Sequence, residues 1–346
     1  MLKVHERDVL LVTGDRSWEV VSGIQEYIDL LEGRNLNHVR IRSKLPRLDL
    51  LESELPGIRK FQPQAIVAIG GGKVIDCGKI IAGLTNCSDE PLSAIKAGLV
   101  GTHVVPIVAA PTTAGSGSEA TQFAVVYDGG RKYSYDNIAL LPRNSLLSIE
   151  PLGSLPRVSL VSSSLDATCQ AIESIWSRGA TPESTQYAKE ALEILWPRVR
   201  SNSFGEEHYQ NLITASNLSG RAINISRTTA PHALSYGLTA EFGVPHGLAV
   251  AAIMPYFLDL HRELAVSEPI RKILGGNMVE EWHQLISLTG MGDELLQTEI
   301  SDNNISQLLN WVNEERLENN PIPLNRENIV DAFLELVENI AKPTWK

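Results

Sequence analysis

Five polar side chains in the second half of the chain have the types and spacing of a metal site. Asp166 and Gln170 are spaced i,i+4, as are His232 and Tyr236, so each pair shares one face of a helix. His246 stands in a Pro-His-Gly turn that would fix the direction of its imidazole. One carboxylate and two histidines suit a divalent metal with open coordination positions, Fe(II) or Zn(II).

The same region also has ordinary structural interpretations. Ser163 and Asp166 have the spacing of a pair that caps the start of a helix. A single histidine on an apolar helix is usually structural. Arg227 lies beside two threonines just before His232, where it can bind an anionic substrate group or stand exposed at a helix end. The spacing alone leaves these alternatives open.

Two glycine-rich stretches in the first half follow apolar runs. The first, Gly70-Gly71-Gly72, follows the run AIVAI at 65–69, and the second is PTTAGSGSE at 111–119. Glycines let the backbone approach an anion, and a helix N-terminus presents free N–H groups. The spacing of the first stretch fits neither a P-loop nor a GxGxxG fingerprint. A tight turn explains either stretch by itself, but two such loops in one sheet favour a dinucleotide site.

Short apolar runs alternate with helical patterns before these loops and between them. The expected strands are 9–12, 39–41, 65–69 and 104–109, and the expected helices are 20–31 and 74–84. This alternation predicts βαβ units and a parallel sheet. From about Ser162 the pattern is helical, with helices expected at 165–176, 185–196, 209–224, 248–260 and 329–340. We therefore predict an α/β dinucleotide-binding domain at 1–160 and an all-α metal- and substrate-binding domain at 161–346.

Composition narrows the class of protein. The 346 residues carry 30 basic and 41 acidic side chains, a formal charge of −11. Nucleic acids and anionic membranes need a basic face, so neither is an expected partner, whereas a small anionic substrate needs only a local arginine. The three cysteines form no CxxC pair, and no apolar segment is long enough to span a membrane. We expect a cytoplasmic protein.

With these motifs in view, the chain resembles the iron-containing (group III) alcohol dehydrogenase family over most of its length. The family patterns GGGSxxDxxK, PTTxGTGSE, DAxxHAIE and HAxxHxxG…PHG have counterparts at 70–79, 111–119, 166–173 and 232–247. The resemblance implies a dehydroquinate synthase-like fold, with a Rossmann-like N-terminal domain that binds NAD(P) and a helical domain that holds the metal. It also implies a homodimer.

The resemblance implies roles for individual residues. The metal ligands fall on Asp166, Gln170, His232 and His246. The cofactor-binding residues fall on Gly70, Gly71, Gly72, Lys73, Asp76, Thr112, Thr113, Ser116 and Ser118. Three residues depart from the family pattern: Gln170 and Tyr236 each replace a histidine, and Lys73 replaces a serine. Tyr236 can still donate a proton.

The departures match one branch of the family. The segments LDATCQAIESIWS, GRAINISRTTAPHALSYGLT and EATQFAVVY resemble phosphonoacetaldehyde reductases, which reduce 2-phosphonoacetaldehyde to 2-hydroxyethylphosphonate. This resemblance implies that Arg227, with Arg221 and Gln170, binds the substrate, because a phosphonate dianion needs a cation. His232, His246 and Tyr236 would then serve the reaction.

The end of the first expected strand bears on the choice of cofactor. Many family members have an acidic residue there that binds the ribose 2′-hydroxyl, but here Gly14 precedes Asp15 and Arg16 follows. A missing carboxylate with a cation nearby favours NADPH over NADH, with Gly14 and Arg16 as contacts.

Other functions remain as alternatives. One is a reductase of another phosphonate carbonyl compound, such as phosphonopyruvate, and a second is a polyol or alcohol dehydrogenase. A third is a dehydroquinate synthase-like lyase, which returns the hydride to its substrate. The last is a nucleotide-binding module whose catalytic site has decayed.

Overall fold

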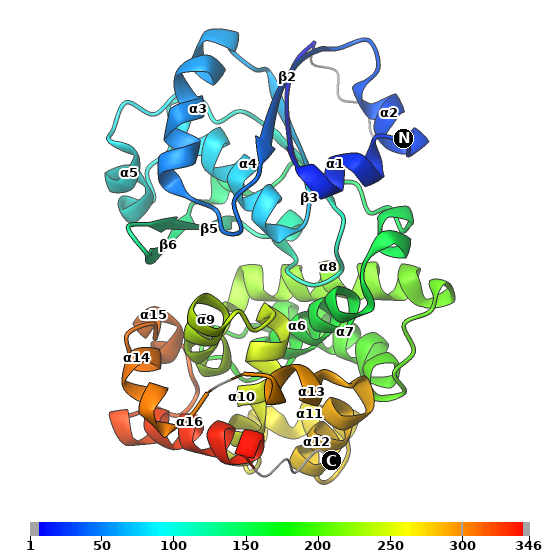
Figure 1. Cartoon of the computed structure of the whole chain (residues 1–346), viewed down its shortest axis with the longest axis vertical. Helices are drawn as coiled ribbons and strands as arrows, with labels where there is room; N and C mark the ends of the chain where they lie inside the picture. Colours follow the sequence, from blue (N-terminus) through cyan, green and yellow to red (C-terminus); the bar gives the residue numbers. More distant parts are fainter. Residues whose placement is uncertain (1–6, 299, 342–346) are drawn as a thin grey trace. The chain divides into compact units, whose positions relative to one another are not determined.

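The computed structural model divides the chain into two compact units, Met1–Leu155 and Pro156–Lys346 (Figure 1). It describes residues 7–298 and 300–341, with the exception of the side chains of Arg16, Met291 and Leu296. The boundary that we expected at residue 160 lies inside α6 (Arg157–Trp176), the first helix of the second unit.

A five-stranded parallel sheet forms the centre of the N-terminal unit. The strands β1 (Asp8–Gly14), β2 (Asn35–Ile41), β3 (Ala65–Gly70), β4 (Ile107–Pro111) and β7 (Asn144–Ser145) lie in the order β2-β1-β3-β4-β7. All strand pairs in this sheet are parallel. The parallel sheet predicted from the alternating pattern is confirmed.

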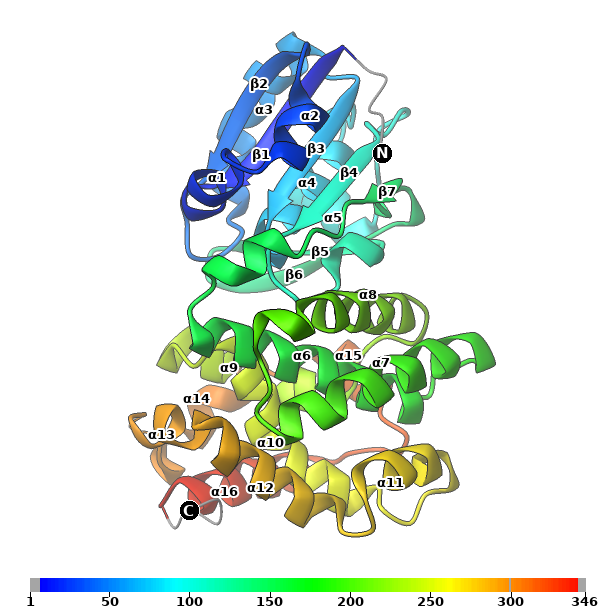
Figure 2. The same ribbon diagram turned by 90° about the vertical axis from the view of Figure 1, so that its right-hand side faces the viewer.

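Helices cover both faces of this sheet (Figure 2). Leu10 and Val12 of β1 point into a core with α3 (Leu48–Phe61) and α4 (Gly72–Leu84). Val9 and Leu11, on the opposite face, pack with α1 (Asp15–Val21) and α2 (Gln25–Leu31). Because alternate residues of each strand enter different cores, the strands read as continuous apolar runs.

A β-hairpin and one further helix complete the N-terminal unit. The strands β5 (Phe123–Asp128) and β6 (Arg131–Asp136) pair antiparallel through Gly129 and Gly130, whose φ angles are 53° and 79°. Positive φ at both turn positions favours glycine. The helix α5 (Pro91–Ala97) begins with a proline and ends before Gly98.

Two expected elements differ from the structure. The helix expected at 20–31 is interrupted, because α1 ends at Val21 and α2 starts at Gln25, with Gly23 in the turn between them. The strand expected at 104–109 begins only at Ile107, because Pro106 has no N–H to give to the sheet.

The C-terminal unit is helical. Its first five helices are α6, α7 (Pro182–Arg200), α8 (Tyr209–Ser226), α9 (Ala230–Phe242) and α10 (His246–Leu260). The described residues then form six further α-helices: α11 (Glu268–Leu274), α12 (Met278–Thr289), α13 (Met291–Leu296), α14 (Ile305–Leu309), α15 (Glu314–Glu318) and α16 (Arg326–Ala341). The helix α6 packs against α7, α8 and α10, and it is buried almost throughout from Leu160 to Trp176. In the described ranges, no helix has the length and apolar character needed to cross a bilayer.

Candidate active site

The helix α6 places two of the predicted metal ligands inside the C-terminal unit. Asp166 and Gln170 are both buried on it. Two neighbouring hydroxyl groups form hydrogen bonds with backbone carbonyls of the same helix. Ser164 Oγ donates to the Leu160 carbonyl at 2.9 Å, and Thr168 Oγ1 donates to the Ser164 carbonyl at 2.7 Å. Because α6 begins at Arg157, Asp166 lies in its interior, and the interpretation of Asp166 as part of a capping pair is wrong.

One carboxylate and two imidazoles converge at this point. One ligand atom each of Asp166, His232 and His246 lies within 4.8 Å of the other two. Asp166 Oδ1 lies 3.2 Å from His232 Nε2 and 3.9 Å from His246 Nε2. This donor set and its convergence fit Fe(II) or Zn(II), which bind carboxylate oxygen and imidazole nitrogen.

The pKa values of Asp166 and His232 are shifted in the directions expected of a cation-binding site. Burial alone would raise the pKa of Asp166, but His232, His246 and the Gln170 amide favour the carboxylate and hold that pKa below its usual range. Burial alone would lower the pKa of His232, but the carboxylates of Glu173 and Asp166 raise it to about 9. The buried carboxylates therefore favour a positive charge on the group between them.

Gln170 contacts the cluster through its amide nitrogen. Gln170 Nε2 donates to Asp166 Oδ1 at 3.1 Å, and Ser219 Oγ donates to Gln170 Oε1 at 3.2 Å. In this orientation the amide holds the Asp166 carboxylate. Ligation of a metal would require the amide to rotate and present Oε1, so the role of Gln170 as a ligand stays a prediction.

His246 depends on a close approach of two helices. It is the first residue of α10, and its neighbour Gly247 lies so near α6 that a Cβ atom there would stand 1.8 Å from the Ser162 carbonyl oxygen. Only glycine permits this contact. Tyr236 stacks on His246 with ring centroids 6.0 Å apart and planes inclined by 7°. The structure therefore brings Tyr236 together with the predicted ligands.

Arg227 has an unusual backbone conformation. Its φ is 63° and its ψ is 173°, a region that glycine almost alone adopts and that costs about 1–3 kcal/mol. The residues on either side are held firmly, because Asn319 Nδ2 donates to the carbonyls of Ser226 at 2.8 Å and Thr228 at 3.0 Å. Ser177 Oγ also donates to the Ser226 carbonyl, at 3.0 Å. Such maintained strain is typical of a functional position.

Arg221 has different surroundings. It is exposed on α8, and its guanidinium lies 4.7 Å from the ring centroid of Tyr187. None of its described contacts joins it to the Asp166–His232–His246 cluster, so its role in substrate binding stays a prediction.

Sequence reasoning missed Glu173, which is fully buried and contacts His232. Asp166, Gln170 and Glu173 stand at i, i+4 and i+7 on α6, so they share one face. This helical periodicity, together with the final glutamate of the DAxxHAIE pattern, is the feature of the sequence from which a role for Glu173 could have been predicted.

The first glycine-rich turn begins α4. Gly71 is the N-cap residue of this helix, and the first N–H groups of the helix follow it. A Cβ at Gly70 would lie 2.6 Å from Val74, and one at Gly72 would lie 2.4 Å from Ser116 Oγ. Packing inside the protein therefore explains Gly70 and Gly72 without a ligand. A Cβ at Gly71 would make only ordinary van der Waals contacts, so packing does not explain this glycine. The start of α4 therefore stays the candidate phosphate site.

The second loop is fixed to α4 and β3 by side chains that were predicted to contact the cofactor. Asp76 accepts hydrogen bonds from Ser118 Oγ and from the Val125 backbone at 3.0 Å. The Thr112 backbone donates to the Gly70 carbonyl at 3.0 Å. Asp76 and Ser118 therefore hold this loop in place, and a direct contact with the cofactor stays a prediction for them, as it does for Thr112, Thr113 and Ser116.

Charged side chains follow the carboxyl ends of β1, β2 and β3. Lys73 Nζ donates to the Ser43 carbonyl at 2.6 Å, and its partial burial lowers the pKa of this amine. Asp15 and Arg42 form an exposed ion pair at 3.5 Å. Gly14, at the end of β1, presents no side chain. The side chain of Arg16 lies outside the described residues.

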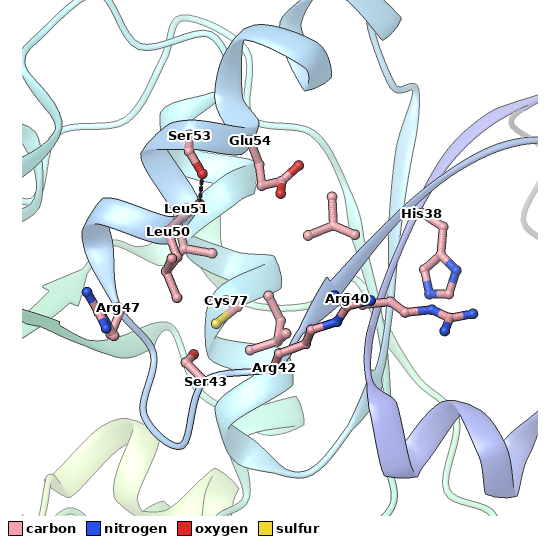
Figure 3. Close-up of a pocket in the computed structure, with 12 residues that line it drawn as sticks. His38, Arg40, Arg42, Ser43, Arg47, Leu50, Leu51, Ser53, Glu54 and Cys77 are labelled. Atoms are coloured by element: carbon pink, nitrogen blue, oxygen red, sulfur yellow. Dashed lines mark hydrogen bonds between the residues drawn. The ribbon is translucent and has the colours of Figure 1, made fainter.

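A cavity of about 410 Å³ lies beside β2 and α3 (Figure 3). Its lining includes Leu51 and Cys77. Figure 3 shows Arg40 directed toward His38, with Arg47 at the opposite end of the cavity. These side chains give the β2 end of the N-terminal unit a basic rim.

Two family descriptions match the chain. Residues 1–148 match the family "Iron-containing alcohol dehydrogenase", and residues 160–337 match "Fe-containing alcohol dehydrogenase family, C-terminal".

Similar proteins are known by sequence. A phosphonoacetaldehyde reductase of Streptomyces viridochromogenes is 36% identical over 204 residues, which cover 56% of this chain and 52% of that protein. The match thus spans about half the length of that relative. An alcohol dehydrogenase of Thermococcus barophilus is 25% identical over 98% of this chain and 92% of its own.

Similar proteins are also known among solved structures. An iron-containing alcohol dehydrogenase of Thermotoga maritima has a TM-score of 0.86 at 25% identity, covering 96% of this chain and 92% of that one. A sulfoacetaldehyde reductase of Bifidobacterium kashiwanohense, solved in complex with NAD⁺, has a TM-score of 0.85 at 26% identity, covering 96% and 91%.

We expect Gly247→Ala to displace α10 from α6 and with it His246. Overpacking of this kind costs about 1–3 kcal/mol, so both the stability and the metal affinity should fall. Thermal unfolding and a Zn(II) titration measure the two effects. The control is Gly276→Ala, where a Cβ would meet nothing within 4 Å. Unchanged metal affinity in Gly247→Ala would show that this helix contact does not position His246.

Proposed function

The chain belongs to the iron-containing alcohol dehydrogenase family, and from this we propose that it is a metal-dependent NADPH-linked reductase of a phosphonate aldehyde. Its reaction would convert phosphonoacetaldehyde to 2-hydroxyethylphosphonate. The observation that carries the proposal is the convergence of Asp166, His232 and His246 inside the helical unit.

The protein's own groups have distinct tasks in this reaction. Asp166, His232 and His246 would hold the divalent ion, and Gln170 orients the Asp166 carboxylate. When both are bound, the metal supplies Lewis-acid polarisation of the carbonyl and the nicotinamide supplies hydride. Tyr236, which stacks on His246, is the candidate donor of the proton to the product oxygen.

The N-terminal unit supports cofactor binding through the start of α4. The Gly71 turn and the first N–H groups of the helix present a positive dipole end to a pyrophosphate. The NAD⁺ complex of the similar sulfoacetaldehyde reductase supports a dinucleotide here. NADPH is favoured because Gly14 offers no carboxylate to the ribose, and Arg42 and Lys73 lie at the neighbouring strand ends.

Arg227 supports the substrate class. Arg227 has a strained and firmly held backbone. It directly precedes Thr228 and Thr229, which lead into α9, the helix of His232. A guanidinium matches the geometry of a phosphonate group. The similar proteins named for phosphonoacetaldehyde and sulfoacetaldehyde support this class, because both names denote two-carbon aldehydes with an anionic group.

Arg227→Ala should raise the KM for phosphonoacetaldehyde about 10–100-fold, because a charge-assisted hydrogen bond contributes about 1.5–3 kcal/mol. Its kcat/KM for propanal should stay near that of the wild type. The matched control is Arg262→Ala, which removes an exposed arginine that pairs with Asp259. Steady-state rates with NADPH and added Fe(II) or Zn(II) give these constants.

Two outcomes would count against this proposal. If Arg227→Ala lowered kcat/KM equally for phosphonoacetaldehyde and propanal, Arg227 would have a structural role only. A wild-type enzyme that prefers propanal or an uncharged alcohol would instead support the alcohol dehydrogenase alternative. Phosphonopyruvate in the same panel tests the keto-acid alternative.

Gly14→Asp should shift the cofactor preference toward NADH. The backbone at Gly14 is extended, and the nearest atom to a Cβ there is Ser17 Oγ at 3.3 Å, so the larger residue fits after a small shift. A carboxylate beside the 2′-phosphate of NADPH costs on the order of 1–4 kcal/mol. We expect the ratio of kcat/KM for NADPH over NADH to fall at least about fivefold. Gly14→Asn, which is neutral and similar in shape, is the control. An unchanged ratio in Gly14→Asp would place the ribose elsewhere.

A further inference from the structure

We infer that Glu173 is a positioning residue for the metal: it fixes the backbone, the ring direction and the tautomer of His232, and so sets the affinity of the site. This inference rests on the proposed metal site. It concerns a residue that touches neither the substrate nor the ion in the arrangement described above.

Glu173 reaches from α6 to the N-terminus of α9, the helix that carries His232. Its Oε1 accepts hydrogen bonds from the Thr229 backbone at 2.8 Å, Thr229 Oγ1 at 3.0 Å and the His232 backbone at 3.3 Å. Pro231, the second residue of α9, has no N–H. The Glu173 carboxylate therefore caps this helix start in place of a local side chain, and its negative charge matches the helix dipole.

The other oxygen of Glu173 acts on the imidazole itself. Glu173 Oε2 accepts a hydrogen bond from His232 Nδ1. A carboxylate accepts only, so the proton belongs on Nδ1, and Nε2 is left to face Asp166 at 3.2 Å. A hydrogen bond to one ring nitrogen of this kind orients the ring and strengthens the other nitrogen as a ligand.

Neighbouring groups hold Glu173 in this position. Trp176 Nε1 donates to Thr229 Oγ1 at 2.9 Å, which turns the threonine hydroxyl proton toward Glu173. Glu173 has no exposed surface, and the side chain of His232 is only 5% exposed. A buried carboxylate costs several kcal/mol unless its partners satisfy it, and here every described hydrogen bond of the Glu173 side chain is with Thr229 or His232.

Glu173→Gln separates the two roles. The amide oxygen can still accept from the Thr229 and His232 backbones, so the cap remains. The amide nitrogen then faces His232 Nδ1 as a donor. Nδ1 must become the acceptor, and the proton moves to Nε2, which removes the lone pair that the metal needs.

The test is a titration of metal-stripped protein with Zn(II) in competition with a chelator, together with the absorption bands of the Co(II) form. We expect Glu173→Gln to raise the dissociation constant for Zn(II) about 10–100-fold and to change the Co(II) spectrum. Glu173→Asp retains the charge and should lose less affinity. If Glu173→Gln does not fold, the Asp variant takes its place, with a loss of more than about threefold expected because the shorter side chain withdraws from Nδ1.

The control is Ser174→Ala on the same helix. It removes the buried hydrogen bond from Ser226 Oγ to Ser174 Oγ at 2.7 Å and should lower the melting temperature while the metal affinity stays within about threefold of the wild type. The inference is overturned if Glu173→Gln binds within threefold of the wild type, or if Ser174→Ala loses as much affinity. A wild type that binds no Zn(II) or Co(II) would overturn the proposed metal site itself, which distinguishes the two failures.

Discussion

The arrangement of the helical unit depends on two buried carboxylates that flank one histidine. Asp166 and Glu173 approach opposite nitrogens of His232, and all three side chains are buried among the helices of this unit. Charges removed from water in this way need compensation, and a divalent cation at Asp166, His232 and His246 would provide it. The close contact of α10 with α6 at Gly247 completes the set by bringing His246 to the same carboxylate.

In the N-terminal unit, a close approach of the backbone positions the two glycine-rich loops against each other. The loop after β4 lies directly on the glycine turn after β3, and there is no room for a Cβ between Gly72 and Ser116. Asp76 then ties this loop to α4 through Ser118. The two loops form one rigid edge at the carboxyl ends of adjacent parallel strands, which is where nucleotides bind in open α/β sheets.

Much of this could be predicted from the sequence, because local periodicity and ordered motifs carry it. The parallel sheet, the helical second half and the family are confirmed. The missed features are contacts between residues distant in sequence. Ser163 could cap a helix only if α6 began directly after it, whereas α6 begins at Arg157. Lys73, on α4, donates to the carbonyl of Ser43, which lies in the loop after β2. The local pattern places Glu173 on the same face of α6 as Asp166, but its partner His232 lies 59 residues further along the chain.

In the proposed reaction, Asp166, His232 and His246 bind a metal that the reduction requires. The most direct test of this requirement is an anaerobic titration of metal-stripped protein with Fe(II), in which bound metal and the rate of NADPH oxidation with phosphonoacetaldehyde are measured together. We expect a single ion per chain, a rate that rises in proportion to bound metal, and the loss of both in Asp166→Asn. A full rate in the metal-stripped protein, or undiminished binding in Asp166→Asn, would contradict it.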